Sequence, residues 1–175
     1  MKFNIFMTLC ENKMKNGGLQ EFIMEHIKDE YVPIEEKQAR SETIVKNTMY
    51  EKNNDGEQVF HVNSVANHIF TTLTLIDMYT DIEIEFKNAL EQYNKMKKNG
   101  VLDMILSHIY KLEMEEFKMI HSYTINDVMT NEYEGHAFVK SQVERFGKLI
   151  GFTLEPFIDK LNTDEILKVL QEAKK

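Results

Sequence analysis

The segment FHVNSVANHIFTTLTLIDMY, residues 60–79, constrains the fold more than any other part of this sequence. Asn63 has a side-chain oxygen of the kind that accepts a hydrogen bond from a backbone N–H at the start of a helix. Apolar residues then recur at roughly helical spacing. They are Val65, Ile69, Phe70, Leu73, Ile76 and Met78. We therefore predict a central core helix that begins after Asn63.

The N-terminal part of the chain predicts further helices over residues 3–15, 19–28 and 34–47. The Gly17-Gly18 pair supplies a permissive backbone that ends the first helix, and Pro33 favours the start of the third. The faces expected to be buried consist of Phe3, Phe6, Met7, Cys10 and Met14, then of Leu19, Phe22, Ile23, His26 and Ile27, and in the third helix of Ala39, Ile44 and Val45.

Residues 48–62, TMYEKNNDGEQVFHV, have a different pattern, with a polar Asn-Asn-Asp-Gly centre between apolar flanks. Asp-Gly suits the positive φ angles of a tight turn, so we predict a small β-hairpin here. Beyond residue 79 the spacing of apolar residues predicts more helices. Their ranges are 80–100, 101–109, 112–132, 138–149 and, after a bend at Gly151 and Pro156, 162–173.

These elements define a fold class: a predominantly helical, all-α domain with one small hairpin near residues 48–62. With 175 residues, 42% of them hydrophobic and 29% charged, the chain has the balance of a globular protein and the length of one ordinary domain. Without any repeat, low-complexity tract or linker, the sequence predicts a single domain over residues 1–175.

Charge and composition exclude several classes of partner. The formal net charge of −8 and a pI near 5.3 oppose general binding to nucleic acid, which depends on Lys and Arg. A membrane partner is not expected either, since no window is long and apolar enough to span a bilayer. Cys10 is the only cysteine, so an intrachain disulfide and a cysteine-based zinc cluster are excluded.

No motif for catalysis, a cofactor or a metal is apparent. His61, His68, His108, His121 and the pair Glu132 and His136 were considered as metal ligands, but neither Glu-x-x-His nor His-Glu-x-x-His occurs. Paired carboxylates such as Glu113, Glu115 and Glu116 have the pattern of a solvated helix face. Ser64, Ser107, Ser122 and Ser141 lack a nucleophile elbow. We predict a non-enzymatic protein without a metal or a cofactor.

Methionines at core-like positions favour core packing over a peptide groove; these are Met49, Met78, Met104, Met119 and Met129.

The C-terminal third is rich in aromatic residues. We predict that protein–protein contacts are made there, through aromatic anchors of the kind that dominate interfaces. The candidate partner-binding residues are Tyr133, Phe138, Phe146, Phe152 and Phe157. Helical spacing does not separate this interpretation from the alternative, in which the same rings close the core.

Three segments together carry a family resemblance: KDEYVPIEEKQARSETIVKNT, FHVNSVANHIFTTLTLIDMYTDIEIEF and NEYEGHAFVKSQVERFGKLIGFTL. They resemble small proteins encoded among the structural genes of tailed bacteriophages that infect low-GC Gram-positive bacteria, over about residues 1–154. The resemblance implies a virion or assembly role with other phage proteins or a second copy as partner, in the host cytoplasm during assembly or in the particle. An alternative from another class is an acidic intracellular inhibitor of a host defence nuclease, in which the charge imitates a phosphate backbone. A helical metalloenzyme is a third alternative.

Overall fold

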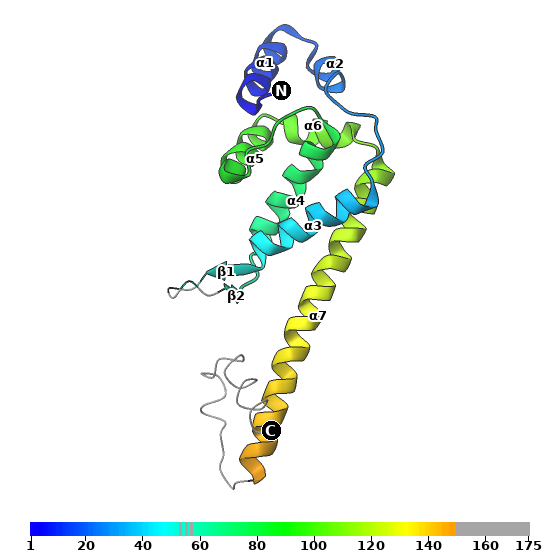
Figure 1. The fold of residues 1–175 in the computed structure, drawn as a ribbon. Coiled ribbons are helices and arrows are strands. Elements are labelled where there is room, and N and C mark those ends of the chain that lie inside the picture. The colour runs from blue at the N-terminus through cyan, green and yellow to red at the C-terminus, as the bar shows by residue number, and fades with distance from the viewer. Residues whose placement is uncertain (53, 55, 57, 150–175) are drawn as a thin grey trace. The chain divides into compact units, whose positions relative to one another are not determined.

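The structure is a computed structural model that describes residues 1–149 apart from residues 53, 55 and 57; for residues 133–149 it describes the backbone alone. Helices dominate this part of the chain, and one two-stranded antiparallel sheet accompanies them (Figure 1). The predicted fold class, all-α with one small hairpin, is therefore confirmed.

The N-terminal pair of helices ends differently from the prediction. Helix α1 (Phe3–Asn16) is followed by Gly17 and Gly18, with φ of 85° and 83°, which confirms the predicted break. Helix α2 (Leu19–Met24) stops four residues before the predicted end at Lys28. The chain leaves the helix because its backbone pairs with a distant segment: the Lys28 N–H donates to the Tyr79 carbonyl at 2.9 Å.

The hairpin and the helices around it agree with the prediction. Helix α3 (Ile34–Thr48) leads into β1 (Tyr50–Lys52) and β2 (Gln58–Phe60), which pair in antiparallel register. The rings of Tyr50 and Phe60 contact each other edge to face across the strands, with centroids 5.7 Å apart. Helix α4 (Ser64–Tyr79) then begins with the predicted cap, because the Asn63 side chain accepts a hydrogen bond from the Ala66 N–H at 2.9 Å.

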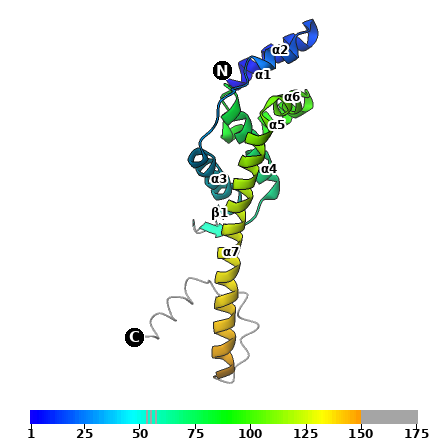
Figure 2. The same cartoon turned by 90° about the vertical axis from the view of Figure 1, so that its right-hand side faces the viewer.

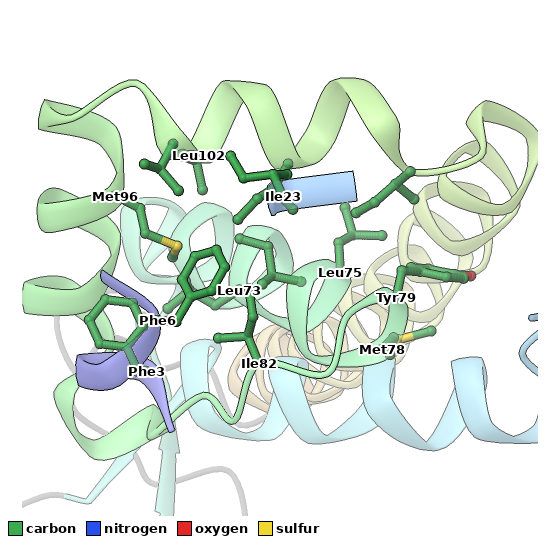
Figure 3. Close-up of a cluster of buried hydrophobic side chains, with 14 of the residues drawn as sticks. Phe3, Phe6, Ile23, Leu73, Leu75, Met78, Tyr79, Ile82, Met96 and Leu102 are labelled. Carbon is green, nitrogen blue, oxygen red and sulfur yellow. The ribbon is translucent and has the colours of Figure 1, made fainter. Parts of the chain in front are cut away.

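Helix α4 lies at the centre of the core, as predicted. Leu73 and Ile76 are fully buried, and Leu73 lies among side chains from α1 and its neighbours (Figure 3). Apolar side chains drawn around α4 include Phe3 and Phe6 of α1, Ile23 of α2, Ile82, Met96 and Leu102. Val65 was wrongly assigned to this face: it is 70% exposed in the first turn of α4.

The predicted helix over residues 80–100 is wrong in its first third. Thr80 is extended, with φ −135° and ψ 167°, and regular helix begins only with the 3-10 turn η1 (Phe86–Asn88) and α5 (Ala89–Lys98). The segment DIEIE alternates charged and apolar residues, which is the period of a strand rather than a helix. Ile82 is accordingly buried while Asp81 and Glu83 are exposed. Helix α6 (Val101–His108) follows as predicted.

Helix α7 (Lys111–Leu149) is continuous through residues 133–137, where the sequence predicts an interruption between two helices. A single Gly135 weakens a helix by about 1 kcal/mol, which 39 helical residues tolerate. The chain divides into two compact units, Met1–Ile125 and Asn126–Lys175, and α7 begins in the first. A single cooperative domain over residues 1–175 stays a prediction. Within the first unit, α7 runs beside α3 and α4 (Figure 2).

A few other predicted core positions are exposed. Met14 is exposed near the C-terminal end of α1, and Met119 lies on the solvent side of α7. Ala39 is exposed on α3, while Ile44 and Val45 are buried as predicted.

Candidate functional site

Buried polar side chains gather where α3, α4 and α7 meet within the first unit. On α3, Lys37, Ser41 and Thr48 are all buried, and they share a face with Ile44 and Val45 because residues four and seven apart lie on one side of a helix. We call the polar groups at this meeting the polar seam. It consists of Lys37, Ser41, Thr48, Asn67, Thr71, Tyr79, Glu113, Glu116 and His121.

One end of the polar seam is a buried charge cluster around Lys37. Its ammonium group is fully buried and bonds the carboxylates of Glu113, at 2.8 Å, and of Glu116. It also lies 4.8 Å from the centre of the Tyr31 ring. The Glu113 carboxylate in turn accepts a hydrogen bond from the Tyr79 hydroxyl at 3.0 Å. The Lys37 ammonium thus links α3 to the start of α7, and the Tyr79 hydroxyl links α4 to the same carboxylate.

The pKa values of this cluster follow from burial opposed by pairing. Burial alone would raise the pKa of Glu113, but hydrogen bonds from Lys37, Tyr79 and the Val32 N–H outweigh it and hold the pKa below its ordinary value. Burial alone would lower the pKa of Lys37, but its bonds to Glu113 and Glu116 raise it. Burial, and then the bond to Glu113, raises the pKa of Tyr79. These shifts keep Glu113 a carboxylate, Lys37 an ammonium and Tyr79 a neutral phenol at pH 7.

The other end of the polar seam is a hydrogen-bond network around His121. The Thr48 hydroxyl donates to the Ile44 carbonyl, so it accepts from the Asn67 amide nitrogen at 3.0 Å. This orients the Asn67 amide oxygen toward His121 Nε2, at 3.2 Å. The Thr71 hydroxyl donates its proton to the backbone carbonyl of Asn67, so its oxygen is also an acceptor toward His121 Nε2, at 3.1 Å. Two acceptors at Nε2 assign the proton to that nitrogen.

The proton on Nε2 leaves Nδ1 of His121 as an acceptor, and the Ser41 hydroxyl donates to it at 2.9 Å. A serine, a histidine and an orienting amide in this order also occur in nucleophilic catalysis. Here Ser41 is fully buried, so its oxygen is sealed from any substrate. Burial lowers the pKa of His121, and the ring packs parallel to Phe117. In this structure the arrangement ties α7 to α3 and α4.

A pocket of about 170 Å³ lies between α3 and α4, on different side chains from the polar seam. Its apolar lining consists of Ile44, Phe70 and Phe86, and the two phenylalanine rings lie 5.6 Å apart. Its polar lining consists of Arg40, Thr43, Asn47 and Thr74. The Arg40 guanidinium bonds Asp77 at 2.9 Å and Glu36 at 3.5 Å. We call this feature the α3–α4 pocket.

Apolar side chains are exposed along one side of α7. Leu112, Met119 and Tyr123 are 60%, 49% and 59% exposed. At about 100° per residue they lie within roughly 40° of one another around the helix axis, well away from Phe117 and His121. We call these three residues the α7 stripe.

The predicted partner-binding residues are not tested by these contacts. Tyr133, Phe138 and Phe146 lie in α7, but their side chains are outside the described residues, as are Phe152 and Phe157 altogether. Contacts through these five residues stay a prediction.

Sequence reasoning missed the polar seam, although it considered several of its members one at a time. From the sequence, His121 is interpreted only as a possible metal ligand, and Glu113 and Glu116 are interpreted only as part of a solvated helix face. A signal was present: Lys37, Ser41 and Thr48 fall on the same helical face as Ile44 and Val45, where polar residues need buried partners.

Two features of the described residues bear on metals and membranes. No three His, Cys, Asp or Glu side chains in this part of the chain are arranged to hold a metal ion. Of the helices in residues 1–149, none combines the length and the apolar character needed to cross a bilayer. No protein-family model matches the chain, and no match was found among curated proteins or solved structures.

Proposed function

We propose that this chain is a non-enzymatic bacteriophage protein that works in the virion or in its assembly through protein–protein contacts. The observation that carries the proposal is the α7 stripe, because clustered exposed Leu, Met and Tyr side chains are typical of surfaces that another protein covers. The resemblance of three sequence segments to phage structural-module proteins gives the biological setting.

The charge distribution favours contacts of this kind over imitation of a phosphate backbone. An imitation requires free carboxylates gathered on one surface. Several carboxylates of the described residues are instead bonded to cations at close range. These pairs are Glu113 and Glu116 with Lys37, Asp77 with Arg40, and Asp103 with Lys97.

The test is mass spectrometry of purified particles and assembly intermediates from cells infected with the encoding phage. Stoichiometric peptides of the chain in either fraction are the expected result. Absence from both fractions would overturn the proposal.

A second arm tests the α7 stripe itself. The double variant Met119→Ser and Tyr123→Ser should fold, because both side chains are about half exposed or more, and should reduce incorporation by at least about tenfold. The matched control is Lys118→Ser, an exposed position on the same turns of α7. Equal incorporation of the double variant and the control would remove the stripe as a contact surface.

A further inference from the structure

The α3–α4 pocket has the size of one aromatic ring. Its volume of about 170 Å³ is close to that of protein cavities that bind benzene, about 150 Å³. Ile44, Phe70 and Phe86 provide apolar contact for a ring inside it. Thr43 and Asn47 are exposed, so the pocket opens at the protein surface.

The charges beside the pocket favour a cation over an anion, although an arginine lines it. The Arg40 guanidinium is bonded to both Asp77 and Glu36, so one positive group and two negative groups leave a net charge of −1 there. The formal charge of −8 for the whole chain adds a field of the same sign.

We propose that the α3–α4 pocket anchors one phenylalanine-type ring of a partner protein that carries a basic residue next to that ring. The inference rests on the proposed function in protein–protein contact, and it assigns a partner chemistry to a surface separate from the α7 stripe. A ring held in a pocket beside opposite charge is the arrangement that makes a few residues dominate an interface.

The experiment titrates the full chain, labelled with ¹⁵N, with three capped dipeptides followed by NMR. Acetyl-Phe-Lys-amide should shift amide signals around Ile44, Phe70 and Thr74. Acetyl-Ala-Lys-amide should bind at least about tenfold more weakly, because it lacks the ring. Acetyl-Phe-Glu-amide should bind about threefold more weakly, because its charge is of the wrong sign.

A pair of tryptophan variants locates the binding. Thr43→Trp places a ring at the mouth of the pocket and should weaken acetyl-Phe-Lys-amide binding by at least about tenfold. Gln38→Trp is the matched control, because Gln38 is exposed on α3 and does not line the pocket, and it should leave binding unchanged.

Two results would overturn the proposal: no peptide shifts signals at the pocket, or Thr43→Trp leaves binding intact. Equal or tighter binding of acetyl-Phe-Glu-amide would show that Arg40 sets the preference and would overturn the assignment of a basic partner. The titration uses the purified chain alone, so its failure leaves the proposed function standing. Absence of the chain from phage fractions would overturn the proposed function and leave the peptide result unaffected.

Discussion

Replacement of Lys37 by methionine should destabilise the protein by about 3–5 kcal/mol, the cost of removing one partner from a buried ion pair. Lys37 is fully buried, and its removal leaves Glu113, whose side chain is 15% exposed, without its cation. Methionine fills nearly the same volume, so loss of packing adds little. Neutralising the carboxylates as well, with Glu113→Gln and Glu116→Gln, should bring stability back to within about 1 kcal/mol of the wild type.

Urea denaturation at pH 7, followed by far-UV circular dichroism, measures these free energies of unfolding. The matched control is Lys46→Met, the same substitution at an exposed position of α3, which should change stability by less than about 0.5 kcal/mol. A cost below about 1 kcal/mol for Lys37→Met would refute the reasoning, since it would mean that water solvates Glu113 without help. Failure of the triple variant to recover stability would show that Lys37 acts through packing instead of charge.

Three further predictions concern the core, the histidine network and metals. Leu73→Ala should lower the free energy of unfolding, measured by urea denaturation, by about 2–5 kcal/mol. Val65→Ala, at an exposed position of the same helix, should lower it by less than about 0.5 kcal/mol. Similar values for the two variants would contradict the assignment of the buried face. Burial lowers the pKa of His121 in the folded protein below its ordinary value of 6.5, so below that pH the unfolded chain binds more protons than the folded protein does. The free energy of unfolding should therefore be highest above pH 6.5 and should decline as the pH falls through the folded-state pKa. His121→Gln should remove the decline between pH 6.5 and 5, and a variant with the same decline would assign it to another group. A strong chelator should leave the melting temperature unchanged, and a stoichiometric metal whose removal unfolds the protein would overturn that expectation.

Local signals in the sequence were sufficient for most of the fold. The Asn63 cap, the Gly17-Gly18 break and the turn signal at Gly56, whose φ is 82°, each act within a few residues, so they are readable without knowledge of neighbours. The end of α2 is different. Residues 25–28 leave the helix because they pair with residues 79–81, and pairing across more than 50 positions has no local signature.

The predicted helix over residues 80–85 is wrong for another reason. Thr80-Asp81 has the composition of a helix start, yet Ile82 and Ile84 alternate with acidic residues. The period of two in this stretch is the better guide, because it reports which side chains face the core. The α3–α4 pocket was beyond sequence reasoning altogether, since it depends on how two helices and the η1 turn pack.

The polar seam gives α7 a register that apolar packing would leave loosely specified. A shift by one helical turn would move α7 by about 5.4 Å. Such a shift would break the Lys37 bonds to Glu113 and Glu116 and separate His121 from Ser41 and from Thr71 at the same time. Each buried polar group left unpaired costs about 1–3 kcal/mol, and more if it is charged. Because all of these contacts are lost in the same shift, one register is strongly preferred, and the seam thereby fixes which side of α7 faces α3 and α4.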